Sequence, residues 1–131
     1  MPEPVIATTR IAAPPEVVFP YFTDPALITT WLADSAELDA RDGGALALQI
    51  SGNALAGSFV TIEPPRRVVF TWGVPGSDVL PVGSSTVEVV LTVDAGETIV
   101  TLTHSGLPEQ ERPSHQEGWN HFLSQLTGAV A

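Results

Sequence analysis

The feature that most constrains the fold is one long amphipathic segment near the C-terminus, residues 114–130. Its apolar side chains recur at helical spacing, with polar side chains between them. Ser114 and Glu117 stand three residues apart in the pattern of a capping box, which predicts a helix that begins at Ser114. About seventeen residues give a helix of roughly 25 Å, which is long enough to cover one face of a sheet.

The middle of the chain alternates between apolar and polar residues with a period of two, which is typical of strands. The predicted strands are 36–41, 45–51, 57–63, 67–73, 86–94 and 98–105. Most of the connections are short and rich in glycine, proline, asparagine or aspartate, so neighbouring strands should be antiparallel. The exception is 73–83, a long irregular loop. The alternation predicts a sheet with one apolar face that needs a cover.

The N-terminal part of the chain predicts one more strand, 5–11, and two short helices, 15–22 and 25–32. A proline stands at the first position of each helix, where its missing N–H costs nothing. Pro20 lies inside the first helix, so we expect that helix to be kinked or very short. The whole chain, 1–131, is then a single α+β domain with about seven antiparallel strands under one long helix.

Charge and composition exclude several classes of protein. The net charge is −10 and all five basic residues are arginine, so nucleic-acid and membrane-surface binding are not expected. There is no apolar run of about eighteen residues and no secretory signal pattern at the N-terminus. Cysteine is absent, which removes disulfides and thiolate chemistry and suits a reducing compartment. We therefore expect a cytoplasmic protein.

Three groups of residues, in this order, resemble a known family. They are 13–19 with 23–25 and 31–32, then 63–72, and then 103–108 with 117–119 and Leu126. Together they resemble the family named after the activator of the heat-shock-protein-90 ATPase, within the SRPBCC superfamily. The resemblance runs almost end to end and implies the helix-grip fold of START-like and birch-pollen-allergen-like proteins. That fold is a curved antiparallel sheet over one long C-terminal helix, with two short helices after the first strand.

The resemblance also implies a function, which is to hold an apolar small molecule between the sheet and the long helix. The inner faces predicted here permit such a cavity, although the same apolar residues would also fill an ordinary core. The predicted pocket residues are Phe22, Trp31, Leu46, Leu48, Phe59, Phe70, Trp72, Val89, Leu91, Leu102, His104, His115, Trp119 and Phe122. We expect a binding or carrier protein that uses no cofactor and no metal.

Two histidines are the polar candidates in this pocket. His104 ends a strand on the inner face, and His115 lies four residues before Trp119 and so on the same side of the helix. They should approach each other at one mouth of the cavity, as a polar anchor, a general base or two metal ligands. The plainer interpretation is one histidine that faces water and one that bonds a loop. A metal would lack a third ligand, and Ser105 beside His104 lacks the carboxylate of a catalytic triad.

Two other classes of function stay open at this point. The family name suggests a chaperone partner, and a homodimer is a further alternative; both need an exposed docking patch. Cyclases and hydrolases also occur on this fold, but a fold alone does not give a function. Since no catalytic group of residues stands out, the sequence favours binding over catalysis without excluding an enzyme.

Overall fold

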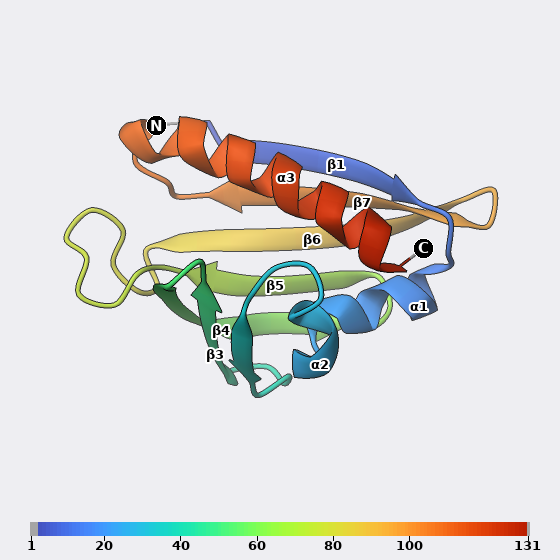
Figure 1. The fold of residues 1–131 in the computed structure, drawn as a ribbon, viewed down its shortest axis with the longest axis horizontal. Helices are drawn as coiled ribbons and strands as arrows, with labels where there is room; N and C mark the ends of the chain where they lie inside the picture. The colour runs from blue at the N-terminus through green and yellow to red at the C-terminus, as the bar shows by residue number, and fades with distance from the viewer. Residues whose placement is uncertain (1–2, 131) are drawn as a thin grey trace.

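The computed structural model describes residues 3–130, in which seven antiparallel strands form one curved sheet in the order β1-β7-β6-β5-β4-β3-β2 (Figure 1). The strands are β1 Val5–Ile11, β2 Ser35–Leu38, β3 Ala45–Ile50, β4 Asn53–Glu63, β5 Arg67–Trp72, β6 Ser85–Asp94 and β7 Glu97–Ser105. The predicted helix-grip fold is therefore confirmed. The bounds differ most at β2, which ends at Leu38, and at β4, which begins at Asn53.

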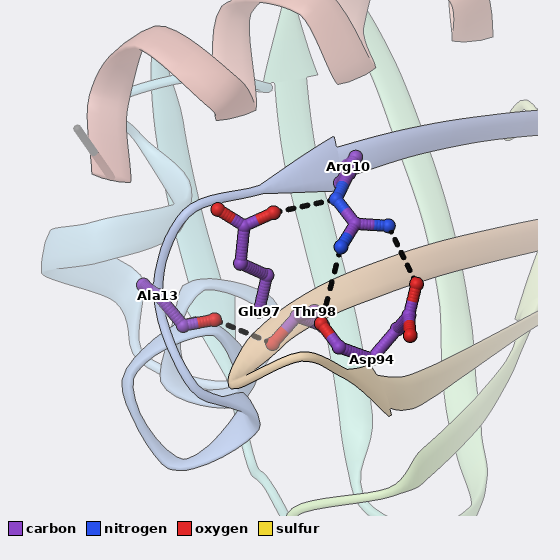
Figure 2. Close-up of polar contacts among 5 residues, drawn as sticks. All are labelled: Arg10, Ala13, Asp94, Glu97 and Thr98. Carbon is purple, nitrogen blue, oxygen red and sulfur yellow. Dashed lines mark hydrogen bonds and ion pairs between the residues drawn. The ribbon is translucent and has the colours of Figure 1, made fainter.

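The β6–β7 hairpin and β1 form the most regular part of the sheet. A two-residue turn joins β6 to β7, and Ala95 and Gly96 both have positive φ there, as the twist of a tight hairpin requires. Figure 2 shows Arg10 of β1 reaching across this turn, where its guanidinium donates to the carboxylates of Asp94 and Glu97. Exposed ion pairs add little stability, but these two link the edge strand β1 to both ends of the hairpin turn.

The two short helices predicted after β1 are present but shorter than expected. The first is α1, Pro15–Val18, which tightens into a 3₁₀ turn, η1, over Phe19–Phe22. Pro20 lies in the first turn of η1, which agrees with the predicted break. The second is α2, Pro25–Ile28, rather than the predicted 25–32. After Ile28 the chain continues in turns, and the hydroxyls of Thr29 and Thr30 bond to carbonyls of the preceding turn, in competition with the helical pattern.

The long C-terminal helix is confirmed as α3, Arg112–Val130, but its predicted start is wrong. A 3₁₀ turn, η2, spans Glu109–Glu111 and runs directly into the helix. Ser114 is therefore already helical, and its Oγ donates to the Glu111 carbonyl at 3.2 Å instead of capping a free N–H. Pro113 lies in the first turn, where a helix tolerates proline.

The helices share one face of the sheet and enclose the core. Figure 1 shows α3 along the β1–β7 side, while α1 contacts β6 and β7 and α2 contacts β2. Trp119, Leu123 and Leu126 are the buried residues of α3, and they belong to the same apolar cluster as Phe22 and the inner faces of the strands. No helix in residues 3–130 is long and apolar enough to cross a membrane.

Candidate functional site

A cavity of about 370 Å³ lies beside the N-terminal half of α3, between that helix, the β3–β4 hairpin and the loop that follows β5. Most of its wall is apolar: Ile50, Leu55, Trp72, Val74, Leu80, Trp119 and Phe122. Its polar groups come from Asn53, Glu111, Ser114 and His115, and the helix passes the cavity with Gly118. Asn53 and Ser114 are exposed, so the cavity opens to solvent on their side.

The loop between β5 and β6 closes one side of this cavity. It folds back on itself because the Ser77 hydroxyl accepts from the Leu80 N–H at 3.0 Å and the Leu80 carbonyl accepts from the Val74 N–H at 2.7 Å. These bonds turn Leu80 inward, and its side chain is only 3% exposed. The irregular segment therefore supplies part of an apolar wall.

The predicted pocket residues divide into two groups in the structure. Trp72, His115, Trp119 and Phe122 line the cavity. The others are at most 4% exposed and are packed in the core away from it: Phe22, Trp31, Leu46, Leu48, Phe59, Phe70, Val89, Leu91, Leu102 and His104. The cavity thus lies beside the N-terminal half of α3 and is not lined by the ten residues that fill the core.

Sequence reasoning missed several residues of the cavity wall. Ile50 continues the inward alternation of Leu46 and Leu48 on β3, so periodicity could have found it. Leu80 carries a weaker signal, as an apolar residue in a loop of glycine, proline and polar residues. Ser114 lines the cavity because the helix begins earlier than predicted, and nothing in the spacing indicates that.

A directional chain of buried hydrogen bonds stands behind the cavity wall. Trp119 Nε1 donates to His104 Nδ1 at 2.9 Å. An indole N–H can only donate, so Nδ1 of His104 accepts and its ring proton is on Nε2. Nε2 then donates to Ser85 Oγ at 2.9 Å, and Ser85 Oγ donates to the Trp72 carbonyl at 2.6 Å. The chain links α3 through β7 and β6 to β5 and fixes the position of the Trp119 ring.

His104 is therefore a fully satisfied, neutral histidine of the core. Burial, and to a lesser extent the neighbouring His115, lower the pKa of its imidazole from 6.5 to about 3. Both ring nitrogens already have partners, so His104 has no lone pair for a metal or for a reacting proton. His104 is thus structural, as in the plainer interpretation, but its partners are Ser85 of β6 and Trp119 of α3 rather than a loop.

In His115, by contrast, only one of the two ring nitrogens has a hydrogen-bond partner among residues 3–130. Its Nδ1 is 2.8 Å from the Glu111 carbonyl, which can only accept, so Nδ1 carries a proton. Nε2 has no hydrogen-bond partner among residues 3–130. The buried side-chain polar atoms without a partner there are Trp72 Nε1 and Arg112 Nε, so His115 Nε2 is accessible. The ring lies on the cavity wall, ready to accept one hydrogen bond.

The two histidines do approach each other, as predicted. The ring centroids of His104 and His115 are 5.3 Å apart, with the rings edge to face. They do not form a metal pair, since both nitrogens of His104 are engaged. Within residues 3–130 there is also no group of three His, Cys, Asp or Glu side chains placed to hold a metal ion.

Comparison with solved structures finds close relatives of this fold. CalU16 from Micromonospora echinospora is 31% identical with a TM-score of 0.81, over 96% of this chain and 74% of that one. An HSP90 activator from Plasmodium falciparum is 26% identical with a TM-score of 0.77, over 98% of this chain and 96% of that one. The Aha1 dimer from Colwellia psychrerythraea has a TM-score of 0.86 at 17% identity over 97% and 95%, a likeness of fold alone.

Sequence comparison leads to one family. An uncharacterized protein of Schizosaccharomyces pombe is 31% identical over 90 residues, which are 69% of this chain but only 25% of that protein. The match thus spans about a quarter of the curated relative. The family model described as "Activator of Hsp90 ATPase homolog 1-like protein" matches residues 12–131, nearly the whole sequence. The resemblance noted in the sequence is therefore confirmed, and the chain belongs to the family of proteins similar to the activator of the Hsp90 ATPase.

Proposed function

We propose that this protein binds an apolar small molecule in the cavity beside the N-terminal half of α3. The observation that carries the proposal is the cavity itself: about 370 Å³, with an aromatic and aliphatic wall and a few polar groups on its open side. Small-molecule sites are typically concave, mostly apolar and of about 300–1,000 Å³. The cavity is at the lower end of that range and suits a ligand of one to three rings.

Burial, a hydrogen bond and ring packing hold part of the cavity wall in place, which supports binding. Trp119 is 3% exposed and is held by its hydrogen bond to His104, and its ring centroid is 5.1 Å from that of Trp72. Binding costs less conformational entropy when the protein groups that contact the ligand are already ordered. The two indoles therefore form an apolar surface whose rings are held by their packing and by the hydrogen bond of Trp119.

Gly118 allows a direct test of the cavity. It lies on the wall, and a Cβ added there would meet no heavy atom within 4 Å. Gly118→Leu should fill the cavity while it favours the helix, because glycine is a poor helix former. Gly128→Leu is the matched control, since Gly128 also has open space around it in α3 but does not line the cavity.

The measurement is a fluorescence titration with the neutral apolar probe N-phenyl-1-naphthylamine. We expect the unmodified protein and Gly128→Leu to bind it, and Gly118→Leu to lose at least about tenfold in affinity through steric exclusion. Thermal unfolding of both variants shows that they are folded. Equal probe binding by both variants, or none by the unmodified protein, would reject the cavity as a binding site.

A chaperone-partner role is the second candidate, and one observation favours it. The HSP90 activator from Plasmodium falciparum matches nearly the full length of this chain at 26% identity. Its test is the ATPase rate of an Hsp90 with and without this protein: stimulation supports the role, and an unchanged rate at saturating protein rejects it. The predicted homodimer, a single domain over 1–131 and a cytoplasmic location also stay proposals. Sedimentation, limited proteolysis and cell fractionation test these three.

A further inference from the structure

The polar groups of the cavity have hydrogen-bonding roles that the rest of the structure already fixes. His115 Nδ1 is committed to the Glu111 carbonyl, so a neutral His115 offers only the lone pair of Nε2 to a ligand. Ser114 Oγ donates its proton to the same carbonyl at 3.2 Å, which leaves the oxygen lone pairs of the hydroxyl. Two neighbouring side chains on one turn of α3 thus present acceptors to the cavity.

Glu111 adds a third acceptor. Glu111 is one of the residues that line the cavity, and among residues 3–130 its carboxylate forms no ion pair and no hydrogen bond. An ionised carboxylate can only accept. Asn53, which bonds weakly to the Ser51 carbonyl at 3.5 Å, is the one polar side chain of the wall that keeps a free donor.

Two features near the cavity could favour an anion, and neither outweighs these acceptors. The positive end of the α3 dipole points here, but the Glu111 carboxylate already lies at that end. Trp72 Nε1 is a donor without a partner, but the atom is buried and does not reach the cavity surface. The net charge of −10 further opposes a negatively charged ligand.

We propose that the ligand is an apolar ring compound with a hydroxyl or amine group, which donates a hydrogen bond to His115 Nε2, and that carboxylated analogues bind more weakly. This inference rests on the proposed function and adds the chemistry of the ligand. The rings lie against Trp72, Trp119 and Phe122, and the donor points to the helix turn that carries His115. A ligand that covers His115 Nε2 without donating to it would leave a buried acceptor unpaired, which costs binding free energy. Ligands that carry a donor should therefore bind more tightly than ligands without one.

The test uses three probes with one skeleton: naphthalene, 2-naphthol and 2-naphthoate, titrated near neutral pH by quenching of tryptophan fluorescence. We expect 2-naphthol to bind roughly fivefold tighter than naphthalene, the size of effect that one net hydrogen bond supplies. We expect 2-naphthoate to bind weaker than either, because its charge meets Glu111.

Variants of two histidines on α3 test whether the preference for 2-naphthol depends on His115 itself. His115→Phe should abolish the preference for 2-naphthol over naphthalene while both still bind. His115→Gln keeps an acceptor and should restore part of the preference. His121→Phe is the matched control, because His121 is exposed and does not line the cavity, and it should keep the full preference.

The outcomes distinguish this inference from the proposed function. If the folded protein binds none of the three probes, the proposed function fails and the inference fails with it. If naphthalene binds but 2-naphthoate binds as tightly as 2-naphthol, the inference alone is wrong. It is also wrong if His115→Phe keeps the preference for 2-naphthol. Loss of the preference in His115→Phe but not in His121→Phe supports it.

Discussion

The two ends of α3 face the same sheet and yet enclose different interiors. At the C-terminal end Leu126 is fully buried, and the Tyr21 hydroxyl reaches the Ala129 carbonyl, so η1 and the helix close on a packed core. At the N-terminal end the helix faces the β3–β4 hairpin and the loop after β5, and a cavity of about 370 Å³ remains. The difference comes from what stands opposite the helix: short helices fill one end, and no element fills the other.

The largest expected effect is at the packed end. Leu126→Ala removes a side chain that is 0% exposed and leaves a void that its neighbours cannot fill, at a cost of about 2–5 kcal/mol. Urea unfolding measures this loss, and probe binding in the cavity should be unchanged at a temperature where the variant is folded. A loss under about 1 kcal/mol would mean that this end is not closely packed.

Acid should destabilise the protein through His104. Its pKa is lowered to about 3 in the folded chain, so between pH 6.5 and 3 the unfolded chain binds a proton that the folded chain does not. Stability therefore falls as the pH drops below 6.5, by roughly 1.4 kcal/mol per unit, or roughly 2 kcal/mol between pH 7 and 5.

Urea unfolding at these two pH values measures this slope. His104→Gln should show a flatter slope over the same range, because its side chain does not titrate, whereas His121→Gln should not. A slope that is the same in His104→Gln and the unmodified protein would contradict the buried neutral imidazole.

At the open end, a substitution should affect probe affinity more than the free energy of unfolding. Phe122 is half-buried on the cavity wall, so Phe122→Ala removes few packed contacts and should cost about 1 kcal/mol of stability. Probe affinity should fall, since the wall loses an aromatic ring. Leu126→Ala is the matched comparison. Leu126→Ala should lower the free energy of unfolding and leave probe affinity unchanged, whereas Phe122→Ala should mainly lower probe affinity.

The smallest expected effect tests where α3 begins. Ser114 does not cap α3, since it lies inside the first turn and its hydroxyl bonds back to Glu111. Ser114→Ala should change the free energy of unfolding by less than about 0.5 kcal/mol. A loss of about 1 kcal/mol or more would indicate that the helix begins at Ser114 after all.

The sequence predicted the sheet and the helix because both depend on local periodicity. β6 alternates between buried and half-buried residues along most of its length, and α3 repeats its apolar residues at helical spacing. The start of α3 was mistaken because η2 extends the helix in the N-terminal direction, which no spacing shows. The location of the cavity depends on how the β5–β6 loop folds back to bury Leu80, a matter of tertiary contacts.

The sequence predicted that the two histidines lie close together, but it could not predict their different hydrogen-bonding roles. His104 and His115 are the same residue type at the same mouth, and only the partners of their nitrogens distinguish them. Trp119 takes the free lone pair of His104, whereas the Glu111 carbonyl leaves that of His115 available. Periodicity places a ring on a face but does not assign its protons.

The hydrogen-bond chain behind the cavity constrains how this protein can change during evolution. Residue 104 must accept from the indole of Trp119 and donate to Ser85 at the same time, and few side chains do both. A change at either His104 or Trp119 alone strands a buried polar atom, whereas a paired change to apolar residues removes donor and acceptor together. The two positions are therefore epistatic: relatives should keep both residues or replace both, and the effects of single substitutions should not add.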